Sequence, residues 1–191
     1  LNLILINDSL NFIRKEGPKN LIELIEVVQN NNQTTIKNNN KCRFLRKNKE
    51  INIYYHYKNL DSLILKGFGK ISNIREMEHS VFINAKDALY SVYLKLNNDS
   101  NKIIIQNGST DFNLFGNCSY IYYYNEGFAP LKAFELEAKN IHIHSNSISN
   151  SEINVSDKLN AEIRNNENIY YEGNSTIIQI INTGNGRLIA R

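Results

Sequence analysis

The sequence predicts an all-β protein built as a β-solenoid, in which short coils of the chain stack on one another. Three observations support this fold class: helical periodicity is almost absent, apolar and polar residues alternate along short segments, and one short sequence motif recurs along the chain. Alternation with a period of two indicates strands with one buried and one solvent-exposed face. It occurs in segments 51–57, 92–96 and 141–143.

Size and composition fit one folded domain. The chain has 191 residues, of which 41% are hydrophobic and 21% charged, so it can bury a core. It contains 33 asparagines. Asparagine and glycine suit the corners of coils because both tolerate left-handed backbone conformations, and asparagine side chains can bond from coil to coil. AT-rich codons are an alternative cause of the asparagine content.

The first part of the chain, residues 1–49, is expected to form a small cap. Gly17-Pro18 precedes apolar residues at helical spacing, and Asn30-Asn31-Asn32 separates two strand candidates at 24–28 and 34–37. We expect a short helical turn followed by a hairpin.

The second part, residues 50–191, is expected to form the coils of the solenoid. An apolar pair, a turn-forming residue and another apolar residue recur, most clearly at 63–71, 161–169 and 180–188. Copies in the C-terminal half lie roughly 18 to 22 residues apart, a period typical of solenoids. One coil cannot bury its own apolar face, whereas stacked coils share a continuous core.

This arrangement predicts where individual side chains point. We expect the following residues inside the stack: Leu65, Ile143, Ile163, and Ile180 or Ile181. We expect these residues outside it: Lys66, His142, His144 and Arg164.

Three motifs follow one another in a fixed order. They are Gly67-Phe68-Gly69, the run Ile169-Tyr170-Tyr171-Glu172-Gly173-Asn174, and the final Gly184-Asn185-Gly186. The series resembles the head GIN domain family of proposed auto-transporter adhesins, over about residues 20–191. The resemblance implies a right-handed parallel β-helix, exported to the envelope of Gram-negative bacteria. Asparagines replace family glycines in the middle coils, as at Asn165-Asn166, and the family has no established catalytic residues to transfer.

The resemblance implies a non-catalytic cell-envelope or surface protein with a binding, adhesin-like or assembly role, and no cofactor. One alternative is a subunit of a larger outer-membrane complex. Another is a carbohydrate-active β-helix enzyme, which would need two carboxylates about 5 to 10 Å apart. The six aspartates are scattered and none adjoins another acid, so the sequence assigns no catalytic residue.

The candidate binding residues are tyrosines in separate coils and a run of positive charge. Neighbouring residues on a strand face opposite ways, so about half of the tyrosines should be outside. An exposed tyrosine could grip a sugar ring or a partner protein; the alternative is that it packs on the sheet surface. The candidates are Tyr54, Tyr122 and Tyr124, with Lys41, Arg43, Arg46 and Lys47, although a solvated loop also explains the basic run.

Charge and hydropathy limit the partners. A net charge of +3 is too small for the phosphate-neutralising surface of a nucleic-acid-binding protein. No apolar run is long enough to cross a bilayer. The family resemblance implies an extracytoplasmic location, in the periplasm, outer membrane or cell surface, with an export signal upstream of Leu1. The expected partner is an envelope protein or glycan.

A metal site, and a disulfide between the two cysteines of this chain, are not expected. His142 and His144 have the His-x-His spacing that can hold zinc, but the local sequence lacks a third ligand. A solvated strand face is the simpler interpretation. Cys42 and Cys118 are expected not to bond to each other, because one lies in the cap and the other several coils along.

Overall fold

The computed structural model describes residues 1–40 and 50–191, which consist mostly of β-strands. The strands are β1 (Asn2–Asn7), β2 (Phe12–Glu16), β3 (Ile25–Asn30), β4 (Gln33–Asn38), β5 (Asn52–Tyr57), β6 (Ser62–Asn73), β7 (Val81–Gly108), β8 (Asp111–Glu126), β9 (Leu131–Ser145), β10 (Ser151–Ile163), β11 (Ile169–Glu172), β12 (Thr176–Asn182) and β13 (Leu188–Ala190). A short helix, α1 (Lys19–Ile22), precedes β3.

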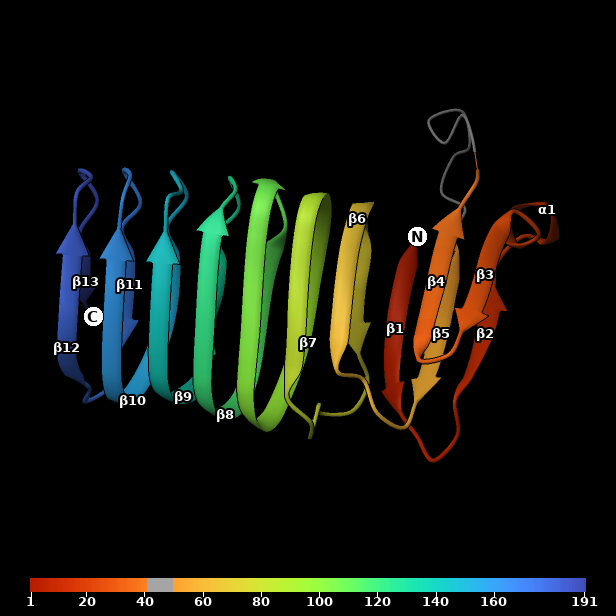
Figure 1. Cartoon of the computed structure of the whole chain (residues 1–191), viewed down its shortest axis with the longest axis horizontal. Helices are drawn as coiled ribbons and strands as arrows, with labels where there is room; N and C mark the ends of the chain where they lie inside the picture. The colour runs from red at the N-terminus through yellow and green to blue at the C-terminus, as the bar shows by residue number, and fades with distance from the viewer. Residues whose placement is uncertain (41–49) are drawn as a thin grey trace.

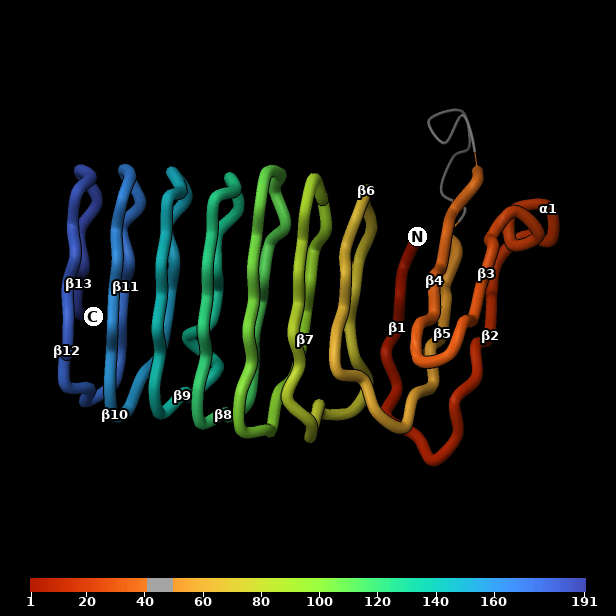
Figure 2. The backbone as a smooth tube through the Cα atoms, viewed as in Figure 1, coloured from red at the N-terminus to blue at the C-terminus, as the bar shows by residue number. Residues whose placement is uncertain are grey.

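From β6 onward the chain winds as a right-handed β-solenoid of about six turns, whose flat coils lie side by side (Figures 1 and 2). Successive strands from β6 to β10 pair in parallel, and β10 pairs in parallel with both β11 and β12. Ile103, Tyr123 and Ile143 occupy one register position in successive coils, and each is almost fully buried. The predicted solenoid class is therefore confirmed.

The interior is a continuous apolar column, as the alternation predicted. Leu65, Ile143 and Ile163 are buried in one hydrophobic cluster, whereas Lys66 and Arg164 are exposed. Each buried column runs through several coils, so one core serves the whole stack.

The prediction for the last coil is right for the direction of Ile180 and wrong for its burial. Ile180 aligns with buried Ala161 and thus lies at an inward position, but its exposed fraction is 50%. Ile181 aligns with Glu162 on the outer side and is 39% exposed. The physical reason is position: an inward side chain is buried only when another coil covers it, and no described strand lies beyond β12.

Tight corners explain two of the glycines. Gly116 has φ = 100°, and a Cβ atom there would lie 2.2 Å from the carbonyl oxygen of Leu96 in the preceding coil. Gly173 has φ = 98° and would meet the carbonyl oxygen of Val155 at 2.2 Å. A side chain is excluded at both corners by conformation and by space.

Asparagines bond from coil to coil, as expected. The backbone N–H of Asn168 donates to Oδ1 of Asn150 at 3.0 Å, and the N–H of Arg187 donates to Oδ1 of Asn168 at 3.0 Å. These side chains satisfy corner backbone groups that lie outside the strand ladders.

The N-terminal end is closed by the predicted helical turn and hairpin. α1 and the β3–β4 hairpin place Leu21 and Ile25 in a small cluster with Ile53 of β5 and with Ile51, which precedes it. β1 lies in the large sheet, parallel to both β5 and β6, although it belongs to the residues expected to form the cap. β2 ends this sheet, antiparallel to β5.

No helix in the described residues is long and apolar enough to cross a membrane. Cys118 lies in the core with a free thiol, whereas Cys42 lies outside the described residues.

Candidate functional site

A row of aromatic and charged side chains crosses the outside of four coils. Tyr122 and Tyr124 of β8 point outward because their neighbours Ile121 and Tyr123 are buried. Parallel register places Tyr122 beside His142 and Tyr124 beside His144, both on β9. We call this row the outer ladder; its members are Lys102, Tyr122, Tyr124, His142, His144, Glu162 and Arg164.

Ring contacts connect the coils within the outer ladder. The ring centroids of Tyr122 and His142 lie 5.1 Å apart in an edge-to-face arrangement, and those of Tyr124 and His144 lie 4.7 Å apart. The ammonium of Lys102 lies 5.4 Å from the Tyr122 ring centroid. Such contacts hold the rings in place, so the row is ordered before any partner arrives.

The ladder ends in a charged cluster. Glu162 of β10 accepts a hydrogen bond from Nε of Arg164 at 2.7 Å, and Nδ1 of His144 lies 2.8 Å from its other carboxylate oxygen. The hydrogen bond from Arg164 is the main cause that lowers the pKa of Glu162 below its ordinary value. The carboxylate is therefore ionised at pH 7.

His144 is held as a neutral donor. Burial is the main cause that lowers its pKa, although the charge of Glu162 opposes the change. Because a carboxylate only accepts, Nδ1 of the neutral ring carries the hydrogen that lies toward Glu162. The hydroxyl of Tyr124 donates to the carboxylate of Glu126, and this contact raises the pKa of Tyr124 to about 12.

The structure separates the sequence-predicted residues. Tyr122 and Tyr124 lie together in the outer ladder, whereas Tyr54 lies on β5 near the N-terminal cap. There the guanidinium of Arg14 lies 4.1 Å from the Tyr54 ring centroid, and a hydrogen bond with Glu16 raises the pKa of Tyr54. The predicted basic residues Lys41, Arg43, Arg46 and Lys47 lie outside the described residues.

Sequence reasoning missed the role of the two histidines. The sequence favours a solvated strand face for His142 and His144, but both are half-buried and contact tyrosines of the preceding coil. The two histidines follow Tyr122 and Tyr124 by about one repeat period of the chain. This spacing could have indicated that the four side chains lie next to each other in adjacent coils. Among the described residues, no group of three or more His, Cys, Asp or Glu side chains is placed to hold a metal ion.

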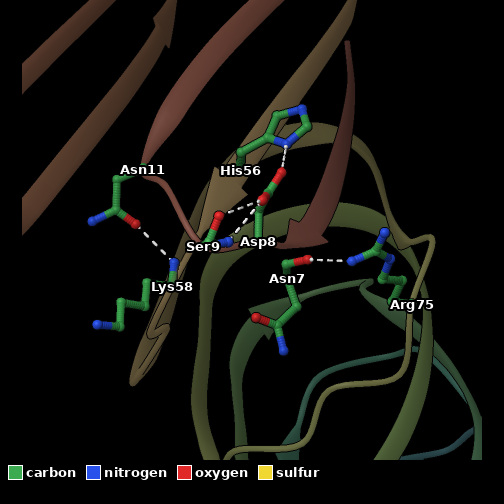
Figure 3. A network of polar contacts seen from close by, with 7 residues as sticks. All are labelled: Asn7, Asp8, Ser9, Asn11, His56, Lys58 and Arg75. Carbon is green, nitrogen blue, oxygen red and sulfur yellow. Dashed lines mark hydrogen bonds and ion pairs between the residues drawn. The ribbon is translucent and has the colours of Figure 1, made fainter.

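A second feature is an open groove where the cap meets the first coil. Its volume is about 580 Å³. Its lining residues are Asn7, Asp8, Ser9, Ile74, Arg75, Glu76, Glu78 and Lys95. At its edge Asp8 accepts from Ser9 and contacts Nδ1 of His56 at 2.8 Å, and Arg75 donates to the carbonyl of Asn7 at 3.3 Å (Figure 3).

Ser9, Asp8 and His56 at the groove are not arranged as a nucleophile with its general base. The hydroxyl of Ser9 donates to Asp8 rather than to His56, so the three residues do not form a nucleophile–base pair. The hydrogen bond with His56 is the main cause that lowers the pKa of Asp8, which makes it a poor proton donor. Among the described residues, Glu167 has a carboxyl group with a raised pKa, but its side chain is fully buried inside the solenoid and does not line the groove.

One family profile and several solved structures are similar to this chain. The profile of the family described as "Putative auto-transporter adhesin, head GIN domain" matches residues 1–175. None of the curated proteins compared with the chain matches it.

Three solved structures share the fold at low sequence identity. A "putative adhesin" from Bacteroides fragilis NCTC 9343 has a TM-score of 0.85 at 19% identity, over 100% of this chain and 88% of that chain. A "putative adhesin" from Parabacteroides distasonis ATCC 8503 has a TM-score of 0.63 at 16% identity, over 100% and 89%. A "putative lipid binding protein" from the same strain has a TM-score of 0.57 at 18% identity, over 98% and 88%.

Proposed function

The chain belongs to the head GIN domain family, and from this premise we propose that it is a non-catalytic binding protein of the bacterial surface. Its binding site is the outer ladder, and its partner is a polysaccharide of the cell envelope. The observation that supports this proposal is the in-register contact of Tyr122 with His142 and of Tyr124 with His144 on one outer face.

The chemistry of the ladder matches a sugar polymer. Aromatic rings contact the C–H faces of sugars, and flanking polar groups hydrogen-bond their hydroxyls. Here the rings of Tyr122 and Tyr124 have Lys102 on one side and the Glu162–Arg164 pair on the other. Rungs about 4.8 Å apart repeat these groups at fixed spacing, which suits a long partner better than a single small molecule.

Rigidity favours binding at such a face. The rings are fixed by their contacts and by the stacked coils, so little side-chain entropy is lost when a partner binds. Lys102 and Arg164 at the borders of the ladder would mainly increase the association rate with an acidic polymer.

The experiment compares binding with turnover. Purified chain is incubated with envelope polysaccharide and, separately, with envelope protein; retained chain and newly formed reducing ends are measured. The proposal expects saturable retention by polysaccharide with no new reducing ends. Cleavage would establish the carbohydrate-active enzyme instead, and retention by the protein fraction alone would replace the glycan by a protein partner.

A further inference from the structure

Among the described residues, the last coil of the solenoid presents an uncovered apolar face. All seven residues of β12 are exposed, including four isoleucines whose exposed fractions range from 39% to 54%. Within the described chain β12 pairs with β10, and β13 pairs with β11, so the outward edge of each strand is unpaired there. A strand edge of this kind readily pairs with another strand.

The two ends of the molecule differ in charge. β2, the edge strand at the N-terminal end, contains Arg14, Lys15 and Glu16, and charged edge strands resist pairing with other chains. β12 has the sequence TIIQIIN, without charge or proline. Its high β-propensity and lack of charge are typical of strands that pair with copies of themselves.

At the N-terminal end, the described residues of the cap already cover the core. The hairpin and α1 already bury Ile51 and Ile53 there. A head-to-tail stack would bring the uncharged β12 edge against this covered, charged end. Contact between two C-terminal ends meets no such obstacle, because each supplies the same apolar edge.

We propose that a second copy of this chain covers the C-terminal face, with the two copies related by a two-fold axis. An axis perpendicular to the flat sides of the coils pairs β12 with its counterpart in antiparallel fashion, and β13 likewise. If the two β12 strands pair with Ile180 opposite Ile180, each residue that faces the interior of one copy lies opposite a residue that faces the interior of the other. The contact is isologous and closed, so it yields a dimer and not a fibre.

This inference is independent of the outer ladder. The ladder lies on the side of coils β7–β10, whereas the dimer contact involves the end of the stack. A dimer would place two ladders along one longer rod, which would raise avidity for a polymer.

Sedimentation and cross-linking test the proposal. We expect the chain to sediment as a dimer of the 22.1 kDa protomer. The substitution Ile180→Lys should weaken dimerisation by at least about 100-fold, because it places a charge in the contact. Ile64→Lys is the matched control, since Ile64 is 55% exposed on β6 far from that end. Circular dichroism checks that both variants remain folded.

Cross-linking keeps the proposal testable if Ile180→Lys fails to fold. In a Cys42→Ser background, Ile180→Cys should form a disulfide between copies under mild oxidation, whereas Ile64→Cys should not. A monomer at all concentrations or open-ended fibres would overturn the proposal. So would a dimer that Ile180→Lys does not weaken and that Ile180→Cys does not cross-link.

Discussion

The hydroxyl of Ser151, at the start of β10, donates a hydrogen bond to the carboxylate of Glu167, and both side chains are fully buried in the coil stack. Ser145 of the preceding coil donates to the other carboxylate oxygen. Burial raises the pKa of Glu167 to about 7, against the opposing effect of the hydrogen bond from Ser151. Folding thus favours the protonated form of Glu167 more than the unfolded chain does.

Glu167 should make stability depend on pH. Its pKa is higher in the folded chain than in the unfolded chain, where it is near the ordinary value of 4.5. Its contribution to stability is therefore full below about pH 4.5 and is lost as the pH rises through about 7. The loss amounts to about 3 kcal/mol, since each unit of pKa difference corresponds to about 1.4 kcal/mol.

Glu167→Gln tests this effect by urea unfolding at several pH values. The stability of the variant relative to the original chain should increase between pH 4.5 and pH 8. Glu137→Gln, at an exposed position on β9, is the control and should show no such trend. Parallel stability curves for Glu167→Gln and the original chain would contradict the assignment.

The core of the fold could be predicted from the sequence because burial follows alternation. Ile141 and Ile143 flank His142, and the structure buries both isoleucines. Alternation indicates which side of a strand faces inward but not whether another coil covers it, which is why Ile180 lies at an inward position and is still half-exposed. It also does not reveal that β1 pairs with β6, because that contact joins distant parts of the chain.

The candidate site could be predicted only in part. Alternation placed Tyr122 and Tyr124 outside, but their contacts with His142 and His144 depend on the register between β8 and β9. Register was uncertain because irregular coil lengths shift it, as between Asn113 and Gly116. Burial of Glu167 was also invisible, since its neighbours Asn166 and Asn168 suggest a solvated corner.

Replacing Tyr123 by phenylalanine should stabilise the folded chain. Its side chain is fully buried, and its hydroxyl has no hydrogen-bond partner among the described residues. Tyr123→Phe removes an unsatisfied polar group and should raise stability by about 1 kcal/mol, whereas Tyr123→Ala should lower it by about 3 to 5 kcal/mol. Thermal unfolding measures both, and a destabilised Tyr123→Phe would show that the hydroxyl has a partner.

Gly116→Ala should destabilise the chain by about 1 to 3 kcal/mol, because the new Cβ would clash with the carbonyl oxygen of Leu96. Gly67→Ala is the matched control: Gly67 also has positive φ, at 79°, but its Cβ would meet no atom within 4 Å. Urea unfolding should therefore show a larger loss at Gly116. Equal losses would mean that backbone conformation alone accounts for both.

Cys118 should resist thiol reagents in the folded chain. Its side chain is buried, and burial raises the pKa of the thiol to about 12, so little reactive thiolate forms at pH 8. In a Cys42→Ser variant, the reaction with a disulfide reagent should proceed only as fast as the chain opens. Rapid modification without denaturant would contradict the buried position.

The most direct test of the account is the affinity of ladder variants for the envelope polysaccharide that retains the chain. Tyr122→Ala and Tyr124→Ala should each weaken binding by about 5- to 30-fold, corresponding to about 1 to 2 kcal/mol. Tyr93→Ala is the control, because Tyr93 is 39% exposed but lies in register with Ser72 and Asn113, outside the ladder. Titration calorimetry should show unchanged affinity for the control. Unchanged affinity in folded Tyr122→Ala and Tyr124→Ala would contradict the claim that the outer ladder is the binding site.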